Sequence, residues 1–195
     1  MGVTIHFKGN LDQLGLIDTF CNEMEDIAKE MKWEYTRIDD LAASDDNPLK
    51  GVIISPHKDS ESLMLTVDSA GILRNVFMMQ FIEKYEDLTY HNFIKTQFAP
   101  VEIHIAVIHL LKYIRQKYMS NLDVMDEGCY WETSDAGLLS EKMAFLNSMM
   151  DKVEGVLKTL TKEKEDSVET VVVKLEQLLS KKFRKAEVRK IKRKT

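Results

Sequence analysis

The ten residues "DEGCYWETSD", from Asp126 to Asp135, bring four carboxylates, two large aromatic rings and a thiol together. Tyr130 and Trp131 have rings with a polar group at one end, and such rings line binding surfaces as readily as protein cores. The carboxylate of Glu132 follows them directly and has the chemistry of a general base. The types of these three residues make the stretch a candidate ligand-binding or catalytic site.

The same stretch also suits a place where one element ends and a helix begins. Residues 126–128 have the composition of a tight turn, because Asp and Gly favour turns. Thr133, Ser134 and Asp135 are good N-cap residues for a helix that follows. Cys129 has the small side chain of a core residue, and activation of its thiol needs a cation or a helix N-terminus nearby. Both interpretations stay open at the level of the sequence.

Histidines supply two further candidates. His57 lies in "SPHKDSE" near Asp59 and Glu61, and a histidine with carboxylates can hold a metal or share a proton. The alternative is a solvated hairpin loop, because zinc and iron sites need three or four ligands at tighter spacings. His104 and His109 are five residues apart, so they do not form the i, i+4 pair of a metal-binding helix.

His104 allows two interpretations. It is either a hydrogen-bonded, partly buried side chain or, if Glu132 lies across the sheet from it, half of a general-base pair. We place a candidate pocket between the predicted sheet and the helix predicted for residues 100–119. The candidate ligand-binding residues are His57, Glu61, His104, Tyr130, Trp131 and Glu132.

The sequence lacks the motifs of the common enzyme classes. It contains no P-loop, no GxGxxG after a strand, no GxSxG, no CxxC and no HExxH. We therefore expect no metal and no cofactor, and the sequence favours a protein that is not an enzyme.

Hydrophobic periodicity predicts the elements that would position these residues. The predicted strands are 3–9, 33–38, 51–55, 61–69, 70–75 and 91–98, with helices at 11–33 and 100–119, part of a helix within 76–90, and a turn with one or two short strands at 121–133. Short turns between strands imply an α+β fold with a curved antiparallel sheet and helices on one face. The order β-α-β-β-β-β-α-β is similar to one half of a TATA-binding-protein-like fold, a likeness of topology that implies no function.

A heptad seam marks the last third of the chain. Its apolar residues alternate spacings of four and three, and the pattern resumes at 168–179 after the polar segment "TKEKEDS". Two long helices with a short connector predict an antiparallel αα-hairpin, whose seam is filled by the hairpin partner, by the body or by a second chain. The predicted domains are a sheet domain (1–136), the hairpin (137–180) and a basic tail (181–195). The seam residues are Leu139, Met143, Leu146, Met150, Val153, Leu157 and Leu160.

Composition places the chain among ordinary globular proteins. It has 195 residues, 44% of them hydrophobic, which is enough for one sizeable core. The start is unlike a signal peptide, and no apolar run has the length of a membrane span. Two cysteines without an export signal predict reduced thiols in the cytoplasm.

The charge is concentrated in the tail. Residues 181–195 carry nine Lys/Arg and one Glu, so the net charge of −5 divides into +8 on the tail and −13 on residues 1–180. With Phe183 as its one aromatic residue, the tail would bind nucleic acid through phosphates, without sequence specificity. The alternative is a frayed, solvated terminus. The candidate phosphate contacts are Lys181, Lys182, Arg184, Lys185, Arg189, Lys190, Lys192, Arg193 and Lys194.

Three hypotheses of function follow, in the order in which the sequence favours them. The first is a non-enzymatic, cytoplasmic protein-interaction or homo-oligomeric module that uses the C-terminal helices. The second is a small-molecule-binding or hydrolytic protein with the pocket named above. The third is non-specific association with nucleic acid through the tail.

Overall fold

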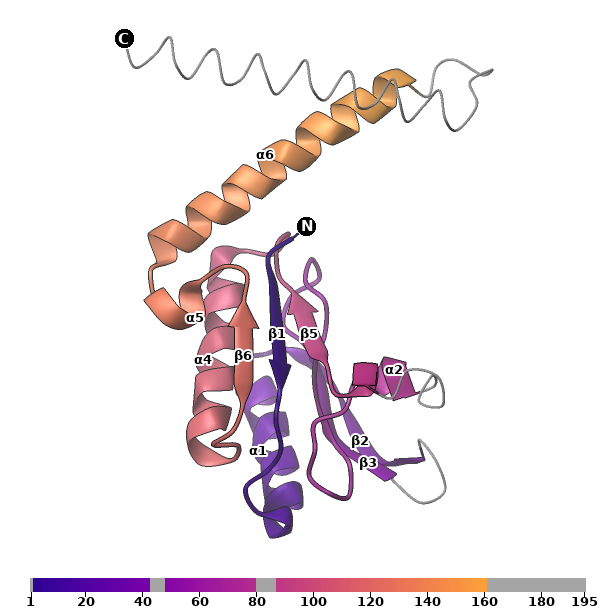
Figure 1. The fold of residues 1–195 in the computed structure, drawn as a ribbon. Coiled ribbons are helices and arrows are strands. Elements are labelled where there is room, and N and C mark those ends of the chain that lie inside the picture. Colours follow the sequence, from indigo (N-terminus) through magenta and orange to yellow (C-terminus); the bar gives the residue numbers. More distant parts are fainter. Residues whose placement is uncertain (1, 43–47, 80–86, 161–195) are drawn as a thin grey trace. The chain divides into compact units, whose positions relative to one another are not determined.

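The computed structural model describes residues 2–42, 48–79 and 87–160. The chain divides into two compact units, residues 1–143 and 144–195, and Figure 1 shows its path. The elements are, in chain order, β1 (Thr4–Lys8), the 3-10 helix η1 (Leu14–Leu16), α1 (Ile17–Glu30), β2 (Glu34–Ala42), β3 (Pro48–Ser55), β4 (Leu63–Val67), α2 (Val76–Met79), β5 (Asn92–Lys95), α4 (Val101–Lys117), β6 (Asp123–Asp126), α5 (Tyr130–Thr133) and α6 (Ala136–Leu160).

Within the described ranges the strands form two three-stranded antiparallel sheets. One has the order β5-β1-β6 and the other the order β2-β3-β4. In the first sheet β1 is central, so that Ile5 lies opposite Ile94 on β5 and Asp126 on β6. In the second sheet β3 is central. The mixture of helices with antiparallel sheets confirms the coarse fold prediction.

The division into two sheets differs from the single curved sheet that the sequence predicted. Segment 70–75, predicted as a strand, makes isolated bridges instead, one of them between Val67 and Leu73. The carboxylate of Asp68 accepts the amide hydrogen of Ile72 at 3.0 Å, and this local bond closes a turn where a strand would pair with a neighbour. The curvature of a TATA-binding-protein-like sheet remains a prediction.

Helix α1 packs on the sheet of β2, β3 and β4. Its stripe of Phe20, Cys21, Met24 and Ala28 is fully buried, as the helical spacing of these residues predicted. The central strand of this sheet carries Gly51, and a side chain there would place its Cβ 2.2 Å from a backbone oxygen of β4. The absence of a side chain at this position therefore lets β3 and β4 approach.

Helix α4 lies within residues 100–119, where the sequence predicted a helix. Val107, Leu111 and Ile114 on its apolar face are fully buried. The last turn of α4 meets α1, because the ring of Tyr118 packs edge-on against Phe20 with 5.3 Å between ring centroids. The two helices are therefore joined through their aromatic residues as well as through the sheets.

The chain after β6 forms a helical turn, α5, and then the long helix α6. The sequence predicted a turn and one or two short strands here, and β6 is one such strand. The carboxylate of Asp135 accepts the amide hydrogen of Leu138 at 3.0 Å, which confirms Asp135 as an N-cap. Helix α6 then continues for 25 residues to Leu160. The second helix of the predicted hairpin lies outside the described residues.

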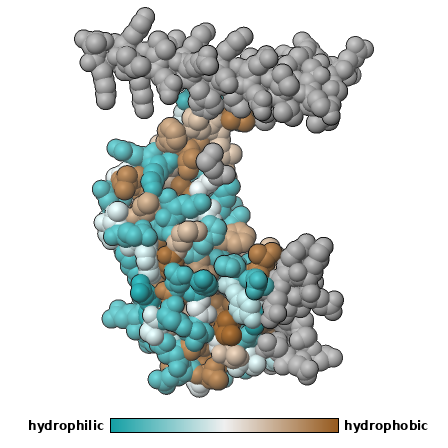
Figure 2. Space-filling model, in the orientation of Figure 1, coloured by the Kyte–Doolittle hydropathy of each residue, from teal (hydrophilic) through white to brown (hydrophobic). Residues whose placement is uncertain are grey.

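Figure 2 shows the hydropathy of one face of the described residues. Hydrophilic and hydrophobic residues are interspersed there, and the brown residues do not merge into one large patch. None of the helices in the described ranges combines the length and the apolar character needed to cross a bilayer.

Candidate functional site

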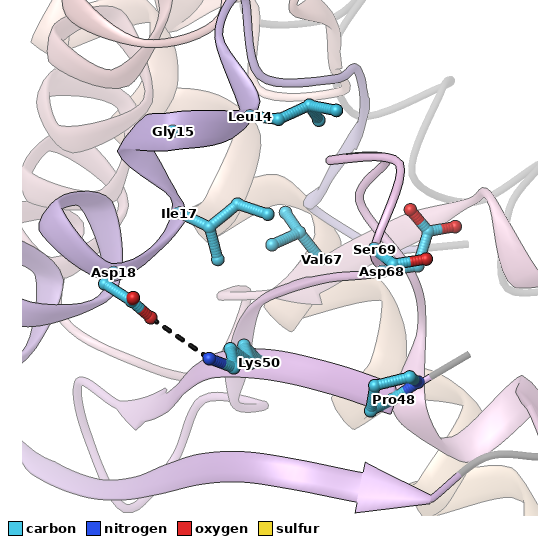
Figure 3. A pocket seen from close by; sticks show the side chains of 9 residues that line it. All are labelled: Leu14, Gly15, Ile17, Asp18, Pro48, Lys50, Val67, Asp68 and Ser69. Carbon is cyan, nitrogen blue, oxygen red and sulfur yellow. Dashed lines mark hydrogen bonds and ion pairs between the residues drawn. The ribbon is translucent and has the colours of Figure 1, made fainter. Parts of the chain in front are cut away.

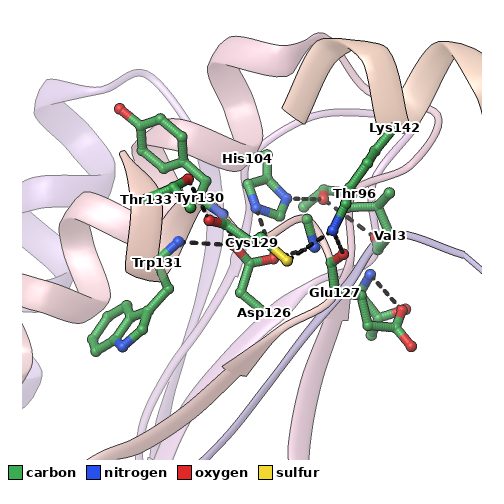
Figure 4. A network of polar contacts seen from close by, with 12 residues as sticks. Val3, Thr96, His104, Asp126, Glu127, Cys129, Tyr130, Trp131, Thr133 and Lys142 are labelled. Carbon is green, nitrogen blue, oxygen red and sulfur yellow. Dashed lines mark hydrogen bonds and ion pairs between the residues drawn. The ribbon is translucent and has the colours of Figure 1, made fainter. Parts of the chain in front are cut away.

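The described structure places His104 at the centre of a buried polar network (Figure 4). Its side chain, on the first turn of α4, is fully buried. Nδ1 lies 2.7 Å from the hydroxyl oxygen of Thr96, which follows β5. Nε2 lies 3.1 Å from Oδ1 of Asp126 at the end of β6, an ion-pair distance when the imidazole is protonated. Nε2 has no partner in hydrogen-bond geometry, so its contact with Asp126 is one of close approach.

Asp126 is held by backbone donors as well. Its Oδ1 accepts the amide hydrogen of Gly128 at 2.6 Å, and its Oδ2 accepts those of Tyr130 at 2.6 Å and Trp131 at 3.0 Å. Burial by itself raises the pKa of the Asp126 carboxyl. The contact with His104 and the amide donors outweigh burial, so the pKa of Asp126 lies below its ordinary value.

The order Thr96–His104–Asp126 is that of a nucleophile, a base and an acid. However, the side chains of all three residues are buried, with 0%, 0% and 5% of their residue surfaces exposed. A substrate atom has no route to the Thr96 hydroxyl in this arrangement. The network therefore works as a polar pin that fixes α4 to the ends of β5 and β6, through the bond of His104 to Thr96 and its contact with Asp126.

Gly128 lies between the imidazole of His104 and the side chain of Leu139. A Cβ at this position would lie 2.6 Å from Cδ1 of Leu139 and 3.0 Å from Nε2 of His104. The turn that starts at Asp126 therefore runs directly over the imidazole, and the first turns of α6 pack on it.

Cys129 follows in an unusual backbone conformation, with φ of 62°. Its sulfur is 2.7 Å from Nζ of Lys142 on α6, and the same Nζ donates to the carbonyl oxygen of Glu127 at 3.2 Å. The thiol is half-buried. A thiol and an amine thus share one corner of the network, beside the imidazole and the carboxylate.

The two aromatic rings of the stretch take different positions. Tyr130 is buried, and its ring centroid lies 6.0 Å from that of His109. Trp131 is half-buried beneath two cations, since Nζ of Lys112 and Cζ of Arg115 lie 5.6 and 5.8 Å from its ring centroid. The indole therefore already has cation–π partners within the protein.

The structure brings some of the candidate residues together and separates others. His104 shares Asp126 with the backbone of Tyr130 and Trp131, whereas Glu132 is exposed. His57 and Glu61 belong to the connection between β3 and β4. Nδ1 of His57 accepts the Asp59 amide at 3.1 Å, and Glu61 accepts the amide of Lys95 on β5 at 2.9 Å.

Three residues of the network, Asp126, Thr96 and Lys142, were not predicted from the sequence as members of a site. Asp126 was assigned to a turn, and its position two residues before Gly128 was a signal for a carboxylate that caps its own turn. Thr96 and Lys142 carried no signal, because their partners are distant in sequence.

Within the described ranges no three His, Cys, Asp or Glu side chains are grouped so that they could hold a metal ion.

Two hollows in the first unit lie outside the network around His104. Figure 3 shows a cavity of about 310 Å³ in which Leu14, Ile17 and Val67 face one another. The ammonium of Lys50 at its edge pairs with Asp18 at 3.2 Å. A second hollow, of about 480 Å³, is a groove between α1 and α4 with a largely apolar lining that also includes two titratable side chains. Its lining residues are Glu23, Ile27, Met31, Trp33, Ala106, His109, Leu110 and Tyr113.

The seam residues divide between the two units. Leu139 and Met143 are buried in the first unit. Leu146 and Val153 in the second unit are half-buried, and Met150 is 44% exposed. The side chains of Leu157 and Leu160, and all of the candidate phosphate contacts of the tail, lie outside the described residues.

Comparisons with known proteins add no family to this description. The chain matches no family model, no curated protein and no solved structure.

Proposed function

We propose that this chain is a non-enzymatic, cytoplasmic association module that pairs with a second copy of itself through α6. The observation that carries the proposal is the division of the heptad seam. Its first two residues are buried in the unit of residues 1–143, and its next five follow in the unit of residues 144–195.

The start of α6 is fastened firmly enough to present the rest of the helix. Asp135 caps it, Leu139 and Met143 anchor it, and Lys142 bonds to the turn before α5. A carboxylate N-cap contributes about 1 kcal/mol, and each buried apolar side chain contributes about 2 kcal/mol. The first two turns of α6 are therefore part of the α+β unit.

We expect the apolar face of the remainder of α6 to pack on a similar seam. Helical stability in proteins comes mostly from the packing of an apolar face. Residues at alternating spacings of four and three form such a face along one side of a helix and pair with a similar seam. A second copy supplies an identical seam, and a symmetric pair is the commonest form of soluble oligomer.

The alternative filling is the αα-hairpin, in which the helix predicted around residues 168–179 returns along α6 within the same chain. The two alternatives predict different masses in solution, that of two chains for the pair and that of one chain for the hairpin. We expect light scattering after size exclusion to give twice the chain mass of 22.6 kDa, with dissociation on dilution.

The discriminating variant places charge in the seam. Leu146→Lys with Val153→Lys should raise the dissociation constant about 100-fold or more, because each lysine forfeits the burial of an apolar side chain worth about 2 kcal/mol. The matched control is Ala144→Lys with Ser148→Lys, which adds the same charge at two exposed positions of the same helix.

The control variant should remain dimeric and the seam variant should run as a monomer, both with unchanged fluorescence from the α+β unit. A wild-type chain that stays monomeric at every concentration would overturn the proposal and assign the seam to the chain's own hairpin. Equal loss of the dimer in both variants would also contradict it.

A further inference from the structure

The contact between Cys129 and Lys142 is not used by the proposed function. Nζ of Lys142 lies 2.7 Å from the sulfur, and its bond to the Glu127 carbonyl oxygen at 3.2 Å gives the amine a second anchor. Figure 4 shows the amine pointing at the sulfur from α6, across the turn between β6 and α5. A nucleophilic nitrogen is therefore held in contact with an oxidisable sulfur.

Both partners are fixed by their surroundings. The amide of Cys129 donates to the Asp126 carbonyl at 3.0 Å, and its own carbonyl accepts from the amide and the hydroxyl of Thr133 at 3.2 and 2.6 Å. On the other side, Leu139 and Met143 are buried on either side of Lys142 along α6. The short distance is thus imposed by two rigid elements.

Cys129 is also the thiol that a small oxidant can reach. It is half-buried, whereas Cys21 is fully buried on the core-facing side of α1. Burial raises the pKa of the Cys21 thiol to about 11, so that it stays protonated and unreactive at neutral pH. Cys21 therefore serves as an internal control, a thiol that should not react with the oxidant.

We propose that Cys129 and Lys142 form a covalent sulfur–nitrogen cross-link when the protein meets hydrogen peroxide. In the first step the sulfur attacks one peroxide oxygen. The O–O bond breaks, an S–O bond forms, sulfur gives up two electrons, and the thiol proton leaves with the displaced hydroxide as water.

The second step is a condensation. The neutral amine of Lys142 attacks the sulfur of the sulfenic acid, the S–O bond breaks as the S–N bond forms, and hydroxide leaves with one amine proton as water. This step moves no further electrons between molecules. It is the reaction by which sulfenic acids condense with backbone nitrogen, here with a side-chain nitrogen already in contact. The product ties the turn before α5 to the first turns of α6, and excess thiol reductant restores both side chains.

Intact-mass spectrometry of the full chain tests the cross-link directly. After mild peroxide, the wild-type chain should become lighter by two hydrogen atoms, and reductant should reverse the change. Trypsin cleaves the reduced chain after Lys117 and Lys142, giving the peptide 118–142, which holds both residues. The cross-linked lysine resists cleavage, so the product should appear as the peptide 118–152 lacking two hydrogens.

The variant Lys142→Arg keeps the positive charge and removes the amine that condenses. We expect it to lose the cross-link and to accumulate sulfenic acid at Cys129, trapped by a 1,3-diketone probe. Lys152→Arg, on the same helix beside a thioether sulfur 3.9 Å away, should cross-link like the wild type. A wild-type chain that only gains oxygen, or a Lys142→Arg chain that reacts identically to the wild type, would refute the proposal.

Discussion

At the scale of single residues, Asp126 is the side chain on which most of the polar network depends. Replacing it with alanine leaves three backbone amides without an acceptor and removes the carboxylate that lies beside the His104 imidazole. Unpaired buried donors cost about 1 to 3 kcal/mol each before relaxation. We expect Asp126→Ala to lower the free energy of unfolding by about 3 kcal/mol, measured by urea denaturation.

The matched control lies three residues earlier on the same strand. Asp123 has a side chain that is 70% exposed and pairs with Lys8 at 3.7 Å. Exposed ion pairs contribute little, so Asp123→Ala should change the free energy of unfolding by less than about 0.5 kcal/mol. Similar losses in both variants would mean that the network around His104 is not the pin described above.

The candidate site could be predicted from the sequence only where its residues are neighbours. The turn at Asp126 and the N-cap at Asp135 follow from local rules that a single sequence expresses. The partners of His104 do not, because Thr96 and Asp126 reach it through the pairing of β1 with β5 and β6. Lys142 meets Cys129 because the first turns of α6 lie against the turn between β6 and α5.

At the scale of elements, a carboxylate clamp joins α1 to α4. Glu23 on α1 accepts hydrogen bonds from the ammonium of Lys117 at 2.7 Å and from the hydroxyls of Tyr113 and Tyr118. Burial raises the pKa of Glu23, but these donors outweigh it and bring the pKa down to about 2. A lowered carboxyl pKa stabilises the fold above the ordinary value of 4.5 and ceases to do so as pH falls through about 2.

The clamp predicts a pH-dependent effect of Glu23→Gln. At neutral pH the substitution should lower the free energy of unfolding by about 1 kcal/mol, since the side chain is 27% exposed and partly screened. The difference from wild type should shrink as the pH drops below 4.5. Urea titrations at neutral pH and at about pH 3 measure it, with Asp26→Asn, 75% exposed on the same helix, as control. A difference that does not vary with pH would contradict a clamp that depends on the ionised carboxylate.

The elements themselves were largely predictable, and their assembly was not. Strand β1 and helices α1 and α4 express alternation or a stripe over their whole lengths, and a packed interior requires that pattern. Segment 70–75 has a similar composition but forms a turn, because the carboxylate of Asp68 supplies a local acceptor and bonds to Arg74 at 2.7 Å. Local side-chain bonds of this kind compete with strand pairing and have no periodicity.

At the scale of the whole molecule, α6 belongs to both compact units, because its first turns fall in residues 1–143 and the rest in residues 144–195. The proposed cross-link and the part of the seam proposed for pairing, from Leu146 onward, lie at different positions along α6. Lys142 lies in the part of the helix that the α+β unit fixes, and Leu146 begins the part that follows. Oxidation at Cys129 would therefore lock the base of α6 without occupying the seam.

The two units can be followed separately in one unfolding experiment. Both tryptophans, Trp33 and Trp131, belong to residues 1–143, so fluorescence reports that unit alone. Far-ultraviolet ellipticity also reports the helix beyond Met143. If α6 pairs with a second copy, the helix beyond Met143 should unfold at a higher urea concentration as the protein concentration rises. Mass action stabilises the pair by about 1.4 kcal/mol for each tenfold rise in protein concentration. This unfolding is seen in the ellipticity but not in the fluorescence. The fluorescence midpoint should stay constant.

A fluorescence midpoint that rises with concentration would place the association surface on the α+β unit, and constant midpoints in both signals would mean that the seam is filled within one chain.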